Sequence, residues 1–140
     1  MSKPVSSEWT GEAALGSLEA VQRFVEDRLE AAACPMKTKM KIAVAVEEVF
    51  VNIASYAYTP GTGPVRVQVA FPEDLSAVSI TFTDSGMAYD PLAKEDPDIH
   101  LPVEDRELGG LGILMAKKLM DELHYEYRDG QNILTLKKNW

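Results

Sequence analysis

The sequence predicts an α+β fold, a two-layer α/β sandwich in which about three helices cover one face of a mostly antiparallel, mixed sheet. Two patterns point to it. Three segments carry apolar residues at helical spacing, and about five short segments alternate apolar and polar residues as half-buried strands do. Helices and hairpins also follow one another along the chain, which is typical of two packed layers.

The composition indicates one globular domain. The 140 residues are expected to form a single domain, residues 1–140, that buries a core without disulfides or structural metal ions. The lone Cys34 excludes an internal disulfide, and the two separated histidines are a poor set of metal ligands. We expect a soluble, cytoplasmic protein, because the acidic first thirty residues predict neither a signal peptide nor a membrane span.

The charge restricts the partners. The formal net charge of -8 and the pI near 4.7 argue against a nucleic-acid-binding surface, which needs clustered lysine and arginine. Protein or small-molecule partners are favoured. A bound polyphosphate would need backbone amides and a few nearby cations to offset the repulsion from the negative net charge of the protein.

The first half of the chain predicts an edge strand followed by two helices. Residues 3–10 are a weak strand candidate. Residues 17–33 show helical spacing, and Pro35 ends that helix because the residue before a proline is pushed out of the helical region. Residues 41–58 form the second helix. Its buried stripe is predicted to consist of Ile42, Val46, Val49, Phe50, Ile53 and Ala57.

Two polar residues of this second helix, Glu48 and Asn52, are four positions apart and therefore share a face. Solvated side chains on a surface helix are the ordinary explanation. However, the helix is otherwise so apolar that most of its sides should be covered. We therefore expect the polar groups of this helix to serve a pocket.

The middle of the chain predicts a hairpin followed by a lid. Residues 65–71 and 77–83 alternate as two antiparallel strands. The second strand leads into Asp84-Ser85-Gly86, where the aspartate can accept hydrogen bonds while the glycine lets the chain pass close to a ligand. An ordinary turn is the alternative. Residues 91–108 are rich in proline and acid, lack periodicity, and are expected to form a long lid.

The last third predicts a helix and a closing hairpin. Gly109-Gly110-Leu111-Gly112 leads into a helix at residues 113–120, and backbone N–H groups at such a helix start can bind phosphate. A glycine-rich loop alone is a weak signal. Residues 124–127 and 132–137 form two strands joined by the Asp129-Gly130 turn.

In this order, the motifs resemble those of the Bergerat-fold ATPases shared by gyrase, MutL and histidine kinases, and most closely the bacterial anti-sigma-factor serine kinases. The resemblance covers roughly residues 18–138. Glu48 with Asn52 is similar to the family's helix motif, Asp84-Ser85-Gly86 to its adenine-binding motif, and Gly109-Gly110-Leu111-Gly112 to its second glycine motif. The chain departs from the family at Ala88, where a second glycine is frequent, and at Tyr56, where a histidine is frequent.

For the adenine end of ATP, the resemblance implies three contacts. Asp84 would accept the amino group of the base. Gly86 would permit the close approach of the base. Thr135, on the closing strand, would support the adenine end.

For the phosphate end, the resemblance implies a metal ligand and a base. Asn52 would hold Mg²⁺, and Glu48 would act as the general base toward a substrate serine. Arg106, in the lid, would neutralise the terminal phosphate. The phosphates would also contact the backbone amides of Gly109, Gly110, Leu111 and Gly112.

The implied activity is that of an ATP-dependent serine/threonine-protein kinase that phosphorylates a STAS-type antagonist protein, sequesters a sigma factor, or does both. A nucleotide-gated protein-binding module with little or no kinase activity is the alternative. A homodimer is possible. A histidine kinase would need a dimerisation hairpin with a phosphoacceptor histidine, and a gyrase-like or MutL-like ATPase would need a transducer domain, so neither is expected.

Overall fold

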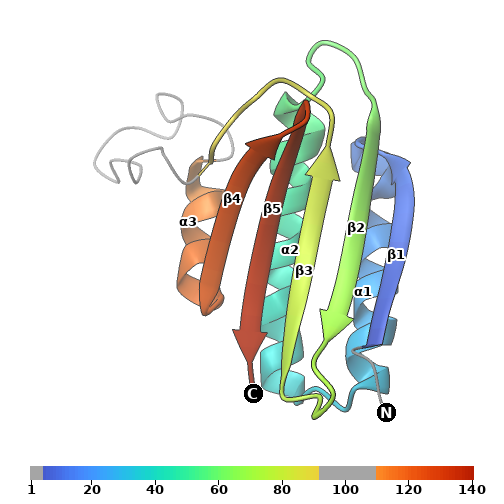
Figure 1. Cartoon of the computed structure of the whole chain (residues 1–140), viewed down its shortest axis with the longest axis vertical. Helices are drawn as coiled ribbons and strands as arrows, with labels where there is room; N and C mark the ends of the chain where they lie inside the picture. Colours follow the sequence, from blue (N-terminus) through green and yellow to red (C-terminus); the bar gives the residue numbers. More distant parts are fainter. Residues whose placement is uncertain (1–4, 92–109) are drawn as a thin grey trace.

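The computed structural model describes residues 5–91 and 110–140. Within these residues, a five-stranded sheet forms one layer, and three α-helices pack on one of its faces (Figure 1). This arrangement confirms the predicted α+β, two-layer fold.

The five strands within the described residues pair in the order β1-β2-β3-β5-β4. Every pairing among them is antiparallel, so the sheet is purely antiparallel rather than mixed. The weak N-terminal strand is real and lies at one edge, as β1. The strands are β1 (Val5–Glu12), β2 (Pro64–Phe71), β3 (Ala77–Asp84), β4 (Glu122–Arg128) and β5 (Gln131–Asn139).

The helices in the described residues are α1 (Leu18–Ala31), preceded by the short 3₁₀ helix η1 (Leu15–Ser17), α2 (Met36–Tyr56) and α3 (Gly110–Leu119). Helix α2 begins at Met36, before the predicted Lys41. The prediction started where the buried stripe starts, but Pro35 is extended, with ψ 146°, and the helix begins directly after it. Its first turns hold lysine and methionine, which are good helix formers, and most of them, namely Met36, Lys37, Met40 and Lys41, are exposed.

The core lies between the sheet and the helices. Alternate residues of β2, namely Val65, Val67, Val69 and Phe71, are at most 3 % exposed. The predicted stripe of α2 faces them, and its members Ile42, Val46, Val49 and Phe50 are 0 % exposed. The period of two in the strands therefore meets the helical period of α2 across one apolar layer.

The closing hairpin fixes the register of β5. Its turn residues Asp129 and Gly130 have φ of 53° and 77°, as a two-residue hairpin turn with two positive φ values requires. The register of β5 against β3 then places Asn132 opposite Asp84 and Thr135 opposite Thr81.

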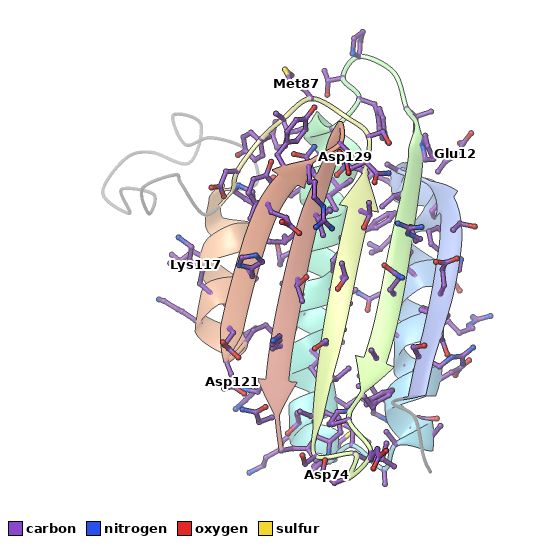
Figure 2. The ribbon with its side chains drawn as sticks, in the orientation of Figure 1. Glu12, Asp74, Met87, Lys117, Asp121 and Asp129 are labelled. Carbon is purple, nitrogen blue, oxygen red and sulfur yellow. The ribbon has the colours of Figure 1, made fainter. Side chains whose placement is uncertain are left out.

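Several element ends meet at one end of the molecule. The C-terminal ends of α2 and β3, the start of α3 and the β4–β5 turn all lie there (Figure 1). Figure 2 places Met87 and Asp129 at this end and Asp74 at the opposite one. Pro91 is described, but the rest of the predicted lid, residues 92–108, lies outside the described residues.

Candidate functional site

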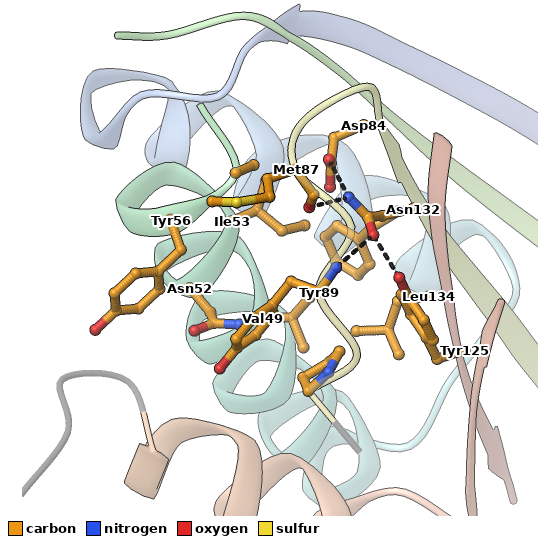
Figure 3. A pocket seen from close by; sticks show the side chains of 13 residues that line it. Val49, Asn52, Ile53, Tyr56, Asp84, Met87, Tyr89, Tyr125, Asn132 and Leu134 are labelled. Carbon is orange, nitrogen blue, oxygen red and sulfur yellow. Dashed lines mark hydrogen bonds between the residues drawn. The ribbon is translucent and has the colours of Figure 1, made fainter. Parts of the chain in front are cut away.

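A pocket opens where these element ends meet (Figure 3). Its walls come from α2, from the end of β3 with the segment that follows, and from the β4–β5 hairpin. The lining residues are Val49, Asn52, Ile53, Tyr56, Ala57, Phe82, Asp84, Met87, Tyr89, Pro91, Tyr125, Asn132 and Leu134.

Asp84 is the buried carboxylate of this pocket, only 5 % exposed. Its Oδ1 accepts a hydrogen bond from the Gly86 amide at 2.9 Å and another from Asn132 Nδ2 at 2.9 Å. Its Oδ2 accepts no hydrogen bond from the described residues. The side chain is therefore held by one oxygen, and the other is available to a donor on a ligand.

Asn132 is a site residue that the sequence analysis missed. It is 7 % exposed, and its Nδ2 also donates to the Met87 carbonyl at 2.9 Å. Its Oδ1 accepts from the Tyr89 amide at 3.1 Å and from the Tyr125 hydroxyl. One amide thus connects β5 with Asp84 and with the segment after β3, as the dashed lines in Figure 3 mark.

Thr135 was the residue predicted for this position, and the structure does not bring it to the pocket. Its hydroxyl lies 3.2 Å from that of Thr81, its neighbour across β3. Successive side chains of a strand point to opposite faces, so Thr135 lies on the helix-free face, whereas Asn132, Leu134 and Leu136 face the helices. The alternation in β5 could have revealed this difference. Asn132 is two residues before Leu134 and therefore lies on the same face of the strand as the buried leucines, whereas Thr135 does not.

Close packing against the end of α2 requires a glycine at position 86. A Cβ atom built at this position would lie 2.1 Å from the carbonyl oxygen of Ala57, just after α2. The next amide, that of Met87, donates to the same carbonyl at 2.9 Å. The segment after β3 is therefore seated on the end of α2, and this contact alone excludes a side chain, whatever the ligand.

Asn52 and Glu48 lie on α2 as predicted, and their environments differ. Asn52 is 6 % exposed, lines the pocket, and makes no hydrogen bond with the described residues. Glu48, one turn earlier, is half-buried, whereas its neighbour Glu47 is exposed. Because Asn52 lines the pocket and its amide is not taken up by another described residue, it is the group of this helix that is best placed to contact a ligand.

Aromatic side chains form the remaining wall. The rings of Tyr56 and Tyr89 are stacked, with centroids 6.2 Å apart and an interplanar angle of 21°. Burial raises the pKa of Tyr125, and the nearby charges of Asp90 and Asp84 raise it further, although a hydrogen bond with the backbone of Tyr89 lowers it. Tyr125 therefore stays protonated at neutral pH and can donate to Asn132.

The remaining predicted residues are only partly described. Arg106 and Gly109 lie outside the described residues. Gly110, Leu111 and Gly112 open α3, whose start lies at the pocket end of the molecule (Figure 1). Across residues 5–91 and 110–140, no cluster of three or more histidine, cysteine or acidic side chains could hold a metal ion. No helix of the same residues is long and apolar enough to cross a membrane.

Residues 11–138 match the family described as the histidine kinase-like ATPase domain. Because the match takes in most of the chain, the protein belongs to this family, and membership implies the use of a nucleotide. The resemblance to anti-sigma-factor serine kinases, predicted from the three motifs, is confirmed by the named relatives that follow.

The chain is 32 % identical over 100 residues to the serine/threonine-protein kinase BtrW of Bordetella bronchiseptica, covering 71 % of this chain and 70 % of BtrW. It is 30 % identical over 98 residues to the serine-protein kinase RsbW of Bacillus cereus, covering 67 % of this chain and 60 % of RsbW. The chain thus spans well over half the length of these relatives.

Two solved structures share the fold. The RsbU and RsbW domains of a Mycobacterium tuberculosis protein align with a TM-score of 0.68 and 17 % identity, over 96 % of this chain and 32 % of that one. The SiaB-SiaC complex from Pseudomonas aeruginosa aligns with a TM-score of 0.62 and 16 % identity, over 94 % of this chain and 87 % of that one.

Proposed function

We propose that this protein is an ATP-dependent serine/threonine-protein kinase and that the described pocket binds the adenine end of ATP. The observation that carries the proposal is the buried carboxylate of Asp84, which has one oxygen fixed by Asn132 and Gly86 and the other available. An exocyclic amino group is the donor that such an acceptor fits, and the apolar lining suits a planar base.

The phosphates would extend from this pocket toward Asn52 and the start of α3. The Asn52 amide fits Mg²⁺, because the residue lines the pocket and makes no hydrogen bond with the described residues. Mg²⁺ is commonly held by few protein oxygens together with nucleotide phosphates. When bound, the ion would neutralise charge on those phosphates. The backbone amides of Gly110, Leu111 and Gly112 at the helix start, with Gly109 and Arg106 before them, would supply further positive potential.

Glu48 would be the general base. In the proposed reaction, the substrate serine oxygen forms a bond to the terminal phosphorus while the bond from that phosphorus to the ADP oxygen breaks. The serine proton passes to the Glu48 carboxylate. Glu48 is half-buried one turn before Asn52, and this spacing supports a role near the phosphate end rather than beside the base.

The proposed partners follow from the relatives. RsbW and BtrW are named protein kinases, and the similar fold of the SiaB-SiaC structure is seen in a complex of two proteins. We propose a STAS-domain antagonist as substrate, a sigma factor as a second partner, and residues 91–108 as a lid within a single domain. A cytoplasmic location would supply ATP.

The experiment measures the melting temperature with and without Mg-ATP. A ligand that binds only the folded state raises it by mass action. Asp84→Asn should lose the shift, because the added amide presents a donor toward the adenine amino group. Asp27→Asn, on the exposed side of α1, is the matched control and should keep the shift. If millimolar Mg-ATP does not raise the melting temperature of the unmutated protein, the proposal is wrong.

A further inference from the structure

The amide of Asn132 uses its full hydrogen-bonding capacity inside the described pocket. An asparagine amide has two N–H donors and an oxygen that can accept two hydrogen bonds. Both donors are taken, by Asp84 Oδ1 and by the Met87 carbonyl. Both acceptor positions are taken as well, by the Tyr89 amide and by the Tyr125 hydroxyl (Figure 3). The amide of Asn132 therefore acts on a ligand through its neighbours rather than by direct contact.

The direction of this amide is fixed by the chemistry of its partners. The carboxylate of Asp84 and the carbonyl of Met87 can only accept, whereas the Tyr89 N–H can only donate. Turning the amide over would therefore place donor against donor and acceptor against acceptor. A tyrosine hydroxyl can do either, and because that of Tyr125 faces Oδ1 of Asn132, it donates. Tyr125 thus supplies the second donor that holds the amide in one direction.

The fixed amide determines what Asp84 presents to a ligand. Oδ1 of Asp84 accepts from Asn132 and from the Gly86 amide, and Oδ2 accepts no hydrogen bond from the described residues. The pocket thus offers the base an acceptor, while both N–H donors of the adjacent Asn132 amide are already used. A 6-amino purine supplies the donor that fits this acceptor. A 6-oxo purine brings an acceptor to the same place and finds no donor on either side chain.

We propose that the Tyr125 hydroxyl, acting through Asn132, makes this pocket select 6-amino purines over 6-oxo purines. The inference rests on the proposed function, because it concerns the same nucleotide site. Tyr125 is a positioning residue, since it acts on Asn132 rather than on the 6-position of the base. Without its hydroxyl, Oδ1 of Asn132 keeps a single donor, the amide holds Asp84 less firmly, and the carboxylate can turn away from an incoming oxo group. The affinity for a 6-amino purine then falls, whereas that for a 6-oxo purine does not.

Tyr127 provides a matched comparison on the same strand. Side chains two positions apart in a strand point to the same face, so Tyr125 and Tyr127 share the helix-facing side of β4. In the register of β4 against β5, Tyr127 even lies directly opposite Asn132. Nevertheless, Tyr127 is 49 % exposed and its hydroxyl makes no hydrogen bond with the described residues. We therefore expect the site to change when the Tyr125 hydroxyl is removed and to stay unchanged when that of Tyr127 is removed.

Isothermal titration calorimetry with Mg-ADP and Mg-IDP measures this selectivity. IDP carries a 6-oxo group where ADP carries the 6-amino group, so the ratio of the two Kd values reports on that edge of the base. The unmutated protein should bind Mg-ADP about a hundredfold or more tightly than Mg-IDP. Tyr125→Phe should narrow this ratio about three- to tenfold, which is the size expected for one hydrogen bond. Tyr127→Phe should leave the ratio unchanged, and melting temperatures confirm that both variants are folded.

A further variant, Asn132→Asp, gives a readout that a purely structural role would not produce. The introduced carboxyl would face the Asp84 carboxylate, which lies at 2.9 Å from the Asn132 amide nitrogen, and two such groups share one proton. The ratio of the Kd values should then change with pH across the neutral range, whereas in the unmutated protein it should stay constant. A ratio that Tyr125→Phe leaves unchanged, or that Asn132→Asp leaves independent of pH, would overturn this inference alone. Failure of the unmutated protein to bind Mg-ADP would overturn the proposed function and this inference with it.

Discussion

The two halves of α2 both depart from the usual pattern in which apolar side chains are buried and polar ones are exposed. At its C-terminal half, a polar side chain is buried, since Asn52 is only 6 % exposed beside the pocket. At its N-terminal half, large apolar side chains are exposed, with Met36 and Met40 more than 60 % accessible. A buried polar group and an exposed apolar stripe are the two observations about burial that carry information beyond stability.

The comparison teaches that one helix can bury an apolar side along the sheet while its other sides differ from one end to the other. Its buried side is apolar throughout, from Ile42 to Phe50, and holds the sheet. Its remaining sides differ because their neighbours differ. Near the pocket, Asn52 lies beside the segment after β3 and the β4–β5 hairpin (Figure 3). At the other end of the helix, Met36 and Met40 are exposed.

The largest expected effect belongs to the pocket half. Glu48→Gln should lower phosphoryl transfer by roughly 10²- to 10⁴-fold, because an amide cannot accept the serine proton. Glu47→Gln is the matched control and should leave the rate unchanged. The rate is measured with radiolabelled ATP on a purified candidate substrate, and ATP binding is followed by calorimetry.

These two variants also separate the kinase from the nucleotide-gated binding module. Transfer that survives Glu48→Gln would refute the general-base role. Loss of ATP binding in the same variant would assign Glu48 a structural role instead. A binding module would show nucleotide binding in both variants and no transfer in either.

A smaller effect is expected within the other half of α2. Ile42→Ala should destabilise the fold by about 2–5 kcal/mol, since Ile42 is fully buried against the sheet. Met40→Ala, two residues earlier, should change the free energy of unfolding by less than about 0.5 kcal/mol. Urea unfolding of dilute protein measures both. A similar loss for both variants would mean that Met40 packs as part of the core rather than lying on the surface.

The smallest expected effect is the pH dependence of stability that comes from Asp121. The amide of Asn139 donates to Asp121, and this hydrogen bond, assisted by Lys138, holds the pKa of the carboxyl below its usual value. The carboxylate therefore stabilises the fold above the unfolded pKa of about 3.9, and the contribution is lost as the pH falls through the lower folded value.

This contribution is small, because the Asp121 side chain is 39 % exposed and solvent screens it. Asp121→Asn should flatten the fall of the unfolding free energy below about pH 4. Urea unfolding across the acidic range measures the slope. An unchanged slope in the variant would show that other carboxyls carry the acid sensitivity.

Local chemistry made much of the fold predictable. The hairpin turn at Asp129-Gly130 needs two positive φ values, and few residue pairs other than Asp-Gly supply them. Alternation in residues 65–71 and 77–83 predicted which side chains would be buried, because a strand has only two faces. For the site, Asp84 and Asn52 were found in advance because polar groups stand at the edge of apolar patterns, and the structure brings both to one pocket.

Long-range pairing made the rest unpredictable. Asn132 contacts Asp84 across two strands that are 48 residues apart in the chain, so no local pattern connects them. Thr135 was chosen without knowing the register of β5, and a strand residue of the wrong parity necessarily points to the other face. The start of α2 was misplaced because helical periodicity reports burial, and the first turns of this helix are exposed.

The sequence by itself therefore determined the element types and the hairpin turn, since each depends on side-chain spacing within one element. Only the tertiary structure decided that Asn132 holds Asp84, that Gly86 is seated on Ala57, and that the Met36 end of α2 stays exposed. Each of these depends on which elements pack together. That packing is set by the summed burial of the whole chain rather than by any single segment.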